Sequence, residues 1–414
     1  MSPFNYIKVS TKLKQIRKVF SITQYSFSKF GINQHYISMI ESDKRSPSSE
    51  MVEAIYNALF EITQGEVTNF CTKEQFCMTL EEQATNWINT YFDNIEKLVA
   101  YYPYCINELK KYNLYNQIYG IYERLANYYS EIADHKKAHK FYLSCIESAI
   151  RNNISPIQTY IKIGKLMQYQ SEYKQALIYY LLALDDATDD DLETYYQIQL
   201  LIAEMYYKSG EFDNSFSVVG KILASCQISK FLAGAKIIEG LIFYEFKNYE
   251  LSIQCFQSVL SDLKYEPYFG FAYYGIALYL TNEKNYVESI ATLEQARHYT
   301  NDPREDLIYL LLLSINYYYL KNYTKAMEYS LEAQTIKTNK TEYSIIKEWY
   351  VHTVTVLCAL KDEKQLLMLL QHAKECQPKE LAQELKFQYL DYLTLAYKDT
   401  PDIFYKKVVE LSKY

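Results

Sequence analysis

Apolar residues recur every three or four positions along most of the chain, which is the spacing of helices that bury one face. Near the start, Val9, Leu13, Ile16 and Phe20 form such a stripe and predict a first helix. Three more short helices are predicted at 23–30, at 33–41 and from Ser48 or Ser49 onward. Thr23 and Asn33 are suitable caps, and Gly31 supplies the turn between the second and third helices.

Beyond residue 80 the helical pattern becomes a repeat. Six segments share a small residue at intervals of 37 to 39 residues, and a second small residue twelve positions later. The first set is Ala126, Gly164, Ala203, Gly240, Ala277 and Ser314, and the second is Ala138, Ala176, Ser215, Ser252, Ser289 and Ala326. Small residues at both positions let two antiparallel helices approach closely. Weaker copies at 80–111, 343–377 and 381–414 bring the prediction to about nine helical pairs.

Composition supports an all-α chain, and the charge differs between the first 60 residues and the remainder. Only 10 Gly and 8 Pro occur in 414 residues, which leaves few turn residues for a sheet protein. The net charge is −7, but residues 1–60 carry eight Lys/Arg against four Asp/Glu. This segment is therefore +4, and the remainder, with 35 Lys/Arg against 46 Asp/Glu, is −11. A basic start suits contact with double-stranded DNA, because phosphate attraction acts over about a Debye length.

Signals for catalysis, metals or membranes are weak. The eight Cys show no CxxC spacing, and Met1 to Lys14 lacks the apolar core of a signal peptide, so a cytoplasmic protein without membrane association is expected. His135 and His139 are four apart but lack the Glu of HExxH, and the acidic run at 185–193 lacks the Gly and Glu of a calcium loop. No phosphate-cradling or nucleophile motif is present. We expect no metal, no cofactor and no enzymatic activity.

The string ITQYSFSKFGINQHYISMIESDKRSPSSE resembles the lambda-repressor or Xre-type DNA-binding domain in its TQ, turn Gly, YIS.IE, KR and PS positions. It departs at Ser21 and Asp43, where Gly is usual, and at Ser28, where Ala is usual. The resemblance implies a helix-turn-helix in which Arg17 pairs with Glu41. It also implies DNA contacts by Gln24, Gln34, His35, Ser38, Met39, Lys44 and Arg45. The alternative is a helical domain that docks to protein and not to DNA.

The repeats resemble the tetratricopeptide repeat, which implies a right-handed superhelix whose concave wall is formed by the first helix of each pair. Positions counted from the small residue then face inward and form a groove for a peptide. The expected peptide-binding residues are Asn127, Lys162, Lys165, Glu204, Tyr207, Tyr244, Tyr274, Asn282 and Tyr318, with Glu123 and Tyr319 on the same wall. Asn amides can bind a peptide backbone, and Tyr rings supply contact area. The alternative is that these side chains only solvate the inner surface.

The two parts together resemble the RRNPP family of quorum-sensing receptors, and are nearer its members with a DNA-binding head than the headless ones. The expected layout is a helix-turn-helix domain at 1–65, a linker at 66–79 and a repeat domain at 80–414. The resemblance implies a cytoplasmic homodimer that binds promoter DNA and a short linear signalling peptide, in a setting such as sporulation. The alternative is a scaffold that binds and inhibits a phosphorelay protein or a kinase. That activity would survive deletion of 1–65, whereas promoter control would not.

Overall fold

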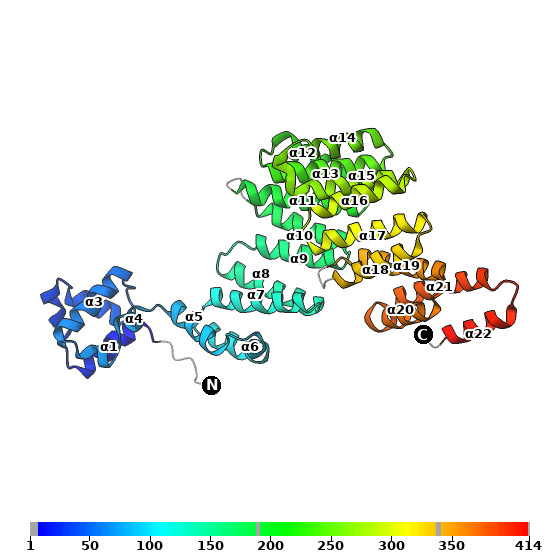
Figure 1. Cartoon of the computed structure of the whole chain (residues 1–414). Coiled ribbons are helices and arrows are strands. Elements are labelled where there is room, and N and C mark those ends of the chain that lie inside the picture. Colours follow the sequence, from blue (N-terminus) through cyan, green and yellow to red (C-terminus); the bar gives the residue numbers. More distant parts are fainter. Residues whose placement is uncertain (1–6, 188–190, 337–340, 413–414) are drawn as a thin grey trace. The chain divides into compact units, whose positions relative to one another are not determined.

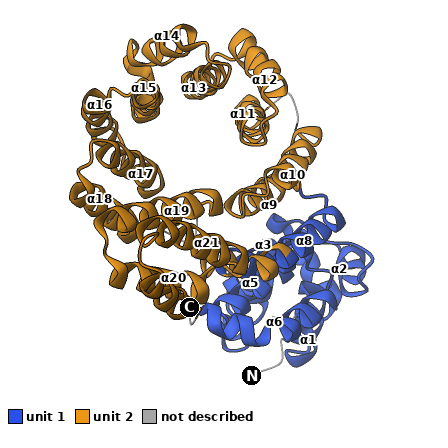
Figure 2. Cartoon of the chain, turned by 90° about the vertical axis from the view of Figure 1, so that its right-hand side faces the viewer, with its two compact units in different colours: residues 1–128, 140–154 blue, residues 129–139, 155–414 orange. Residues whose placement is uncertain are grey.

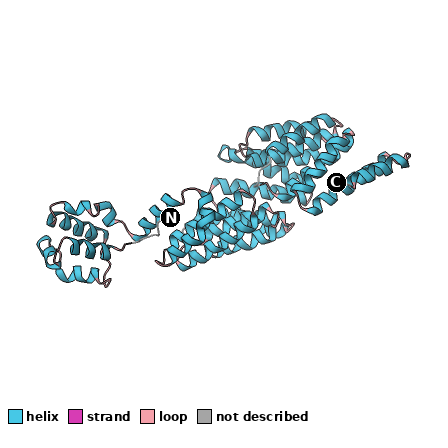
Figure 3. Cartoon of the chain, turned by 90° about the horizontal axis from the view of Figure 1, so that it is seen from below, coloured by secondary structure: helices cyan, strands magenta, loops and turns pink. Residues whose placement is uncertain are grey.

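The computed structural model describes residues 7–187, 191–336 and 341–412. These residues form helices, turns and loops, and no strand occurs among them (Figure 3). None of their helices has the length and apolar character needed to cross a bilayer. The first six residues of the stretch inspected for a signal peptide, and the centre of the acidic run at 185–193, lie outside the described residues. Two compact units are present, 1–128 with 140–154, and 129–139 with 155–414.

Unit 1 begins with a small helical domain, which we call the head and which runs from α1 to α4 (Figure 1). Its helices are α1 (Val9–Val19), the 3-10 helix η1 (Gln24–Phe30), α2 (Gln34–Glu41), α3 (Ser49–Ile62), the 3-10 helix η2 (Glu66–Asn69) and α4 (Lys73–Cys77). Asn33 and Ser48 cap α2 and α3 by accepting from backbone N–H groups of the first turn. The predicted second helix is present as a 3-10 helix. The Ser26 hydroxyl shares a hydrogen bond with the Thr23 hydroxyl at 2.9 Å, a local contact of the kind that competes with a regular α-helix.

Five residues in the head have a left-handed backbone: Ser21, Gly31, Asp43, Gln64 and Gly65. Gly31 ends η1 with φ of 76°, as the turn prediction requires. Ser21 and Asp43, which replace the Gly usual in the Xre-type pattern, have φ of 53° and 56°. A non-glycine residue in this region is less favourable by roughly 1–2 kcal/mol. The head therefore keeps the turn geometry of the pattern at some loss of stability.

Residues 66–79, which the sequence analysis assigns to a linker, are largely helical and pack on the head. Val67 and Phe76 are fully buried in one core with Leu13, Ile37 and Leu59. The Lys12 ammonium donates hydrogen bonds to the carbonyls of Gln75, Phe76 and Met78 at the end of α4, where the helix exposes unsatisfied acceptors. Lys12 is buried by this contact, so one of the eight cations counted in the basic segment is not available to phosphate.

Eighteen further helices follow among the described residues, arranged as nine consecutive pairs. They are α5 (Leu80–Tyr91), α6 (Ile95–Lys110), α7 (Tyr115–Glu131), α8 (His135–Arg151), α9 (Ile157–Tyr169), α10 (Tyr173–Asp185), α11 (Leu192–Lys208), α12 (Phe212–Ser225), α13 (Ser229–Glu245), α14 (Tyr249–Leu260), α15 (Phe269–Asn282), α16 (Tyr286–His298), α17 (Pro303–Tyr319), α18 (Tyr323–Ile336), α19 (Tyr343–Leu360), α20 (Glu363–Cys376), α21 (Lys379–Ala396) and α22 (Pro401–Leu411). A 3-10 helix, η3 (Leu263–Tyr268), precedes α15. The two units divide within the pair α7–α8.

The two small residues of each repeat bring the helices of a pair together as predicted. In four pairs a serine hydroxyl donates to the backbone carbonyl of the small residue twelve positions away: Ser215 to Ala203, Ser252 to Gly240, Ser289 to Ala277 and Ser314 to Ala326. These distances are 2.6–2.9 Å, and the serines are fully buried. A side chain must be short for its hydroxyl to reach a neighbouring helix backbone. This register is that of a tetratricopeptide-like repeat.

The turn inside each pair is also periodic. Seven residues after each small residue, the backbone adopts positive φ, between 59° and 77°, at Ala133, Ser171, Gly210, Lys247, Lys284 and Lys321. A left-handed residue after the last helical turn satisfies orphan carbonyls and reverses the chain. Glycine stands at one of these six positions, which explains why the sequence contains so few glycines.

Within unit 2, the first helices of successive pairs lie beside one another and form an inner wall. Contacts join α11 to α13, α13 to α15, α15 to α17 and α17 to α19. Figure 2 shows α9, α11, α13, α15, α17 and α19 on the inner side of a ring, with α10, α12, α14, α16 and α18 outside them. The superhelix predicted from the repeats is thus present in unit 2.

Candidate functional site

A cavity of about 440 Å³ lies against the inner wall of unit 2. Much of its apolar surface comes from the same two positions of three successive first helices, three residues before and one residue after the small residue. These residues are Ile237 and Leu241 on α13, Tyr274 and Leu278 on α15, and Leu311 and Ile315 on α17. Positions four apart share one helix face, so three stacked helices present a continuous apolar strip. Its volume lies within the range of about 300–1,000 Å³ typical of ligand pockets.

One side of the cavity is closed by a charged cluster. Lys208, at the end of α11, donates to Glu204 at 2.8 Å and to Glu342 at 2.5 Å. Glu342 also accepts from Gln168 at 3.0 Å and from the Tyr173 hydroxyl at 2.9 Å. Burial alone would lower the pKa of Lys208, but the two carboxylates raise it, so the ammonium stays charged.

This cluster joins segments that are far apart in the sequence. Glu342 lies 134 residues from Lys208 and 174 from Gln168. A backbone contact reinforces it, since the Ser344 N–H donates to the Ser171 hydroxyl at 2.8 Å. The start of α19 is therefore held against the α9–α10 turn and α11, which closes the ring of helices in unit 2 (Figure 2).

Glu348, on α19, lines the same cavity but takes no part in the cluster. No hydrogen bond or ion pair joins its carboxylate to another described residue. Surrounding protein raises the pKa of Glu348 by desolvation, although the residue is exposed to solvent at the edge of the cavity that it lines. Burial, and then the nearby charge of Glu348, raises the pKa of Tyr274. The two side chains therefore form a polar end of the cavity that is not satisfied internally.

Three of the nine expected peptide-binding residues line this cavity: Glu204, Tyr207 and Tyr274. The other six do not. The Asn127 amide oxygen accepts from the Tyr142 hydroxyl at 2.9 Å, and the Asn282 amide donates to the Tyr249 hydroxyl at 3.1 Å. These two amides contact tyrosines of their own helical surroundings, which leaves less of each free for a peptide backbone.

The remaining four expected residues lie on first helices but outside the cavity. Tyr244 packs on Tyr249 with ring centroids 5.6 Å apart, and Tyr318 packs on Tyr323 at 5.5 Å. Lys162 and Lys165 lie on α9. Burial, with the like charge of Arg304 next, lowers the pKa of Lys165.

The sequence analysis predicted neither the apolar strip nor the two glutamates, Glu342 just before α19 and Glu348 within it. It selected polar inner residues and made no prediction for Ile237, Leu278 and Ile315. Their spacing of 37 or 41 residues, at fixed offsets from the small residue, is the signal that could have found them. For Glu342 and Glu348 the sequence holds no such signal. Their place in the cavity depends on the rotation that accumulates over the helical pairs between α9 and α19.

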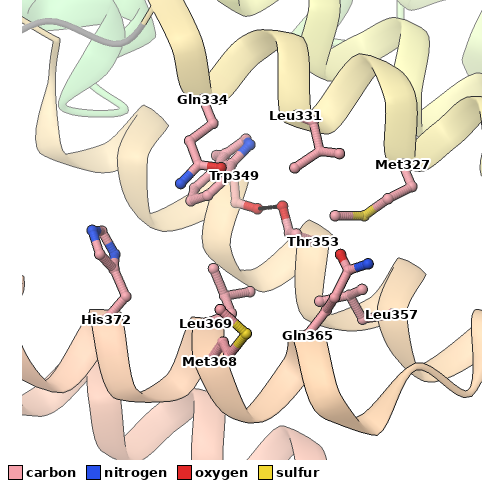
Figure 4. Close-up of a pocket in the computed structure, with 10 residues that line it drawn as sticks. All are labelled: Met327, Leu331, Gln334, Trp349, Thr353, Leu357, Gln365, Met368, Leu369 and His372. Carbon is pink, nitrogen blue, oxygen red and sulfur yellow. Dashed lines mark hydrogen bonds between the residues drawn. The ribbon is translucent and has the colours of Figure 1, made fainter.

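A second cavity, of about 260 Å³, lies between α18, α19 and α20 (Figure 4). Its lining is mainly apolar, with Met327, Leu331, Leu357 and Met368. The one hydrogen bond drawn within it, from the Thr353 hydroxyl to the Trp349 carbonyl at 2.6 Å, is internal to α19. We interpret it as a packing gap between neighbouring helices, since a single first helix, α19, contributes to it and the strip formed by α13, α15 and α17 is absent from its lining.

The expected DNA-contacting residues of the head cluster on α2 and the turn after it. Gln34 and His35 are exposed at the start of α2, and Lys44 and Arg45 are exposed beyond its end. Ser38 and Met39 are half-buried. Arg45 lies over the Tyr36 ring at 4.8 Å, an arrangement that positions the guanidinium without neutralising it.

Gln24 differs from its expected role. Its amide donates to Glu41 at 2.8 Å and does not point freely outward. The same carboxylate accepts two hydrogen bonds from Arg17, at 2.6 and 2.7 Å, and Arg17 also donates to the Ile22 carbonyl. The Arg17–Glu41 pair implied by the Xre-type resemblance is thus present, and Gln24 belongs to it. Desolvation opposes these contacts, but together they lower the pKa of Glu41.

His135 and His139, the pair considered above as a metal site, lie in α8 and make contacts within the protein. His139 shares a hydrogen bond with the Tyr179 hydroxyl at 2.9 Å, and His135 lies at the first residue of α8. Burial lowers the pKa of both imidazoles. Across 7–187, 191–336 and 341–412, no group of three or more His, Cys, Asp or Glu is placed to hold a metal ion.

No protein-family model matches the chain. No curated protein matches it either. Among solved structures, a tetratricopeptide repeat protein from Parabacteroides merdae is 19% identical, with a TM-score of 0.41 over 65% of this chain and 97% of its own. Pseudomonas aeruginosa pilF is 16% identical, with a TM-score of 0.38 over 56% and 97%. A signal transduction ATPase with a tetratricopeptide repeat sensor, from Pyrococcus horikoshii, is 16% identical, with a TM-score of 0.33; the match covers 95% of this chain and 55% of that protein. At these scores the fold assignment rests on the internal contacts described above.

Proposed function

We propose that this protein is a transcription regulator that binds a short linear peptide in the inner cavity of unit 2 and promoter DNA through its head. The observation that carries the proposal is the cavity itself. Three stacked first helices supply a strip of apolar side chains, and polar groups converge at its edge. An apolar cavity with few well-placed polar groups is the usual form of a ligand site. Stacked helical repeats provide such a surface for extended chains.

The DNA-binding part of the proposal rests on the head. Its α2 presents exposed Gln34 and His35 after a turn at Gly31, and cations at Lys44 and Arg45 follow. Gln and Asn amides can read adenine in the major groove, whereas Lys and Arg hold phosphates. The order of these residues resembles the Xre-type pattern, and the whole layout resembles the RRNPP family. By that resemblance we propose a homodimer that presents two heads to one operator.

Calorimetry of the full-length protein with candidate peptides, such as those encoded beside its gene, tests the peptide half of the proposal. The informative variant is Ile315→Trp, which fills the cavity from α17, and its matched control is Val287→Trp on the exposed face of α16. We expect Ile315→Trp to weaken binding by about tenfold or more, equivalent to about 1.4 kcal/mol, and Val287→Trp to leave it unchanged. Equal affinity in both variants would place the peptide elsewhere.

Genome-wide mapping of bound DNA tests the other half. The wild-type protein should enrich a defined set of promoters, and a Gln34→Ala/His35→Ala variant should lose that set while remaining folded. A random distribution for both proteins would exclude sequence-specific control through α2.

A further inference from the structure

The inner cavity of unit 2 carries an excess of negative charge. Among the described residues, its lining includes three carboxylates, Glu204, Glu342 and Glu348, and one cation, Lys208, so these four groups sum to −2 when all are ionised. Lys208 contacts Glu204 and Glu342, and not Glu348. The Glu348 carboxylate is thus left with an apolar strip beside it and no compensating group from the described residues.

Tyr274 stands next to this carboxylate at the polar end of the cavity. Its ring packs on Tyr309 with centroids 5.6 Å apart, which fixes its position. No hydrogen bond of its hydroxyl to another described residue is present. Glu348 and Tyr274 come from α19 and α15, so the closure of the ring is what brings them to one site.

We propose that Glu348, with the hydroxyl of Tyr274, binds a positively charged group of an otherwise apolar peptide. This group is either the N-terminal ammonium or the head group of a Lys or Arg side chain. The inference deepens the proposed peptide-binding function and rests on it. It names a class of ligand, since the apolar strip of α13, α15 and α17 selects aliphatic or aromatic side chains and the carboxylate selects one cation.

An acidic peptide is the wrong partner for this cavity. Its carboxylate would meet the like charge of Glu348 and be repelled by it. A neutral apolar peptide would fill the strip but leave Glu348 desolvated without a partner. Supplying an ammonium or guanidinium satisfies the carboxylate, and a hydrogen bond to a charged group then contributes about tenfold or more in affinity.

Defined peptide mixtures test this inference without knowledge of the natural ligand. The probes are three pools of tetrapeptide amides built from Leu, Ile, Val and Phe. One pool has a free N-terminus, one is N-acetylated, and one is N-acetylated with a single Lys. Equilibrium dialysis with detection by mass spectrometry measures binding to the full-length protein, to Glu348→Gln and to Glu283→Gln. Glu283 is an exposed carboxylate just after α15 that does not line the cavity, so its variant is the matched control.

We expect the wild-type protein and Glu283→Gln to retain at least one cationic pool about tenfold better than the neutral pool, and Glu348→Gln to lose that preference. Preference for the free N-terminus alone identifies the ammonium as the ligand group, and preference for the Lys pool alone identifies a side chain. If all pools bind equally and Ile315→Trp abolishes binding, the inference is wrong while the proposed function stands. If no pool binds, or Ile315→Trp has no effect, peptide binding in the cavity is refuted and the inference with it.

Discussion

Replacing Gly275 by Ala should destabilise unit 2, although alanine is the better helix former. A Cβ at this position of α15 would lie 2.3 Å from Cζ of Phe256 and 2.5 Å from Cε1. The Phe256 ring, from α14, is fully buried and cannot swing aside. A Cβ at Gly240 of α13 would also be close to this ring, at 2.7 Å from Cε1. The end of the ring therefore lies against two glycines from successive first helices.

Two effects of opposite sign decide the size of the change. Gly→Ala in a helix interior contributes about 0.5–1 kcal/mol of stability through backbone entropy and propensity. Overpacking a filled core costs about 1–3 kcal/mol. Since the clash falls well below any normal contact distance, the packing loss should prevail, and we expect a net destabilisation of about 1–2 kcal/mol.

Gly220 provides the matched control. It lies within α12, it is exposed, and no atom apart from its chain neighbours and the local helix backbone would come within 4 Å of an added Cβ. Gly220→Ala should therefore stabilise by about 0.5–1 kcal/mol. Urea unfolding followed by circular dichroism measures both variants, and adding Phe256→Leu to Gly275→Ala should recover part of the loss. If Gly275→Ala is as stable as Gly220→Ala, the close packing of successive first helices described here is wrong.

Four further predictions concern the head and the repeats. Removing either partner of the Arg17–Glu41 pair should destabilise the head by about 2 kcal/mol, more than replacing both, and a double-mutant cycle in urea measures the coupling. Because the folded pKa of Glu41 is lowered, its contribution should be complete above the ordinary Glu range and disappear as pH falls through the folded value, which acid titration of the unfolding midpoint will show. Gln34→Ala should weaken specific duplexes by about 1–3 kcal/mol, whereas Lys44→Ala should weaken all duplexes alike, as read by fluorescence anisotropy at fixed salt. Asn127→Ala should leave the affinity for a cavity-bound peptide unchanged in calorimetry, since Asn127 does not line the cavity.

Much of the helical architecture was predictable because it is set by local rules. The small residues of each repeat predicted which helices pair, and the buried serine hydroxyls on neighbouring backbones confirm that close approach. In the head, Gly31 and the cap at Asn33 predicted where α2 begins, because left-handed turns and helix caps depend on a few adjacent residues.

The candidate site was less predictable, because it depends on distant contacts. Glu342 and Glu348 reach the cavity only when the small rotation of each pair accumulates into a full turn, and no local pattern encodes that sum. Two of the expected amides, Asn127 and Asn282, hydrogen-bond to tyrosine hydroxyls. With 46 Tyr in the chain such contacts are common, but the repeat spacing does not show which amides make them. Lys12 was missed as a buried group for the same reason, since its acceptors lie more than 60 residues away.

The coupling between the cavity and the head can be measured as the affinity of the full-length protein for its operator with and without a saturating cavity-bound peptide. A ligand changes a second equilibrium only if it binds the two states unequally, and typical couplings are about 5–150-fold. Fluorescence anisotropy with labelled operator should show a change of at least about fivefold for the wild-type protein and none for Ile315→Trp. An operator affinity that stays the same while calorimetry shows the cavity filled would contradict a peptide-responsive regulator.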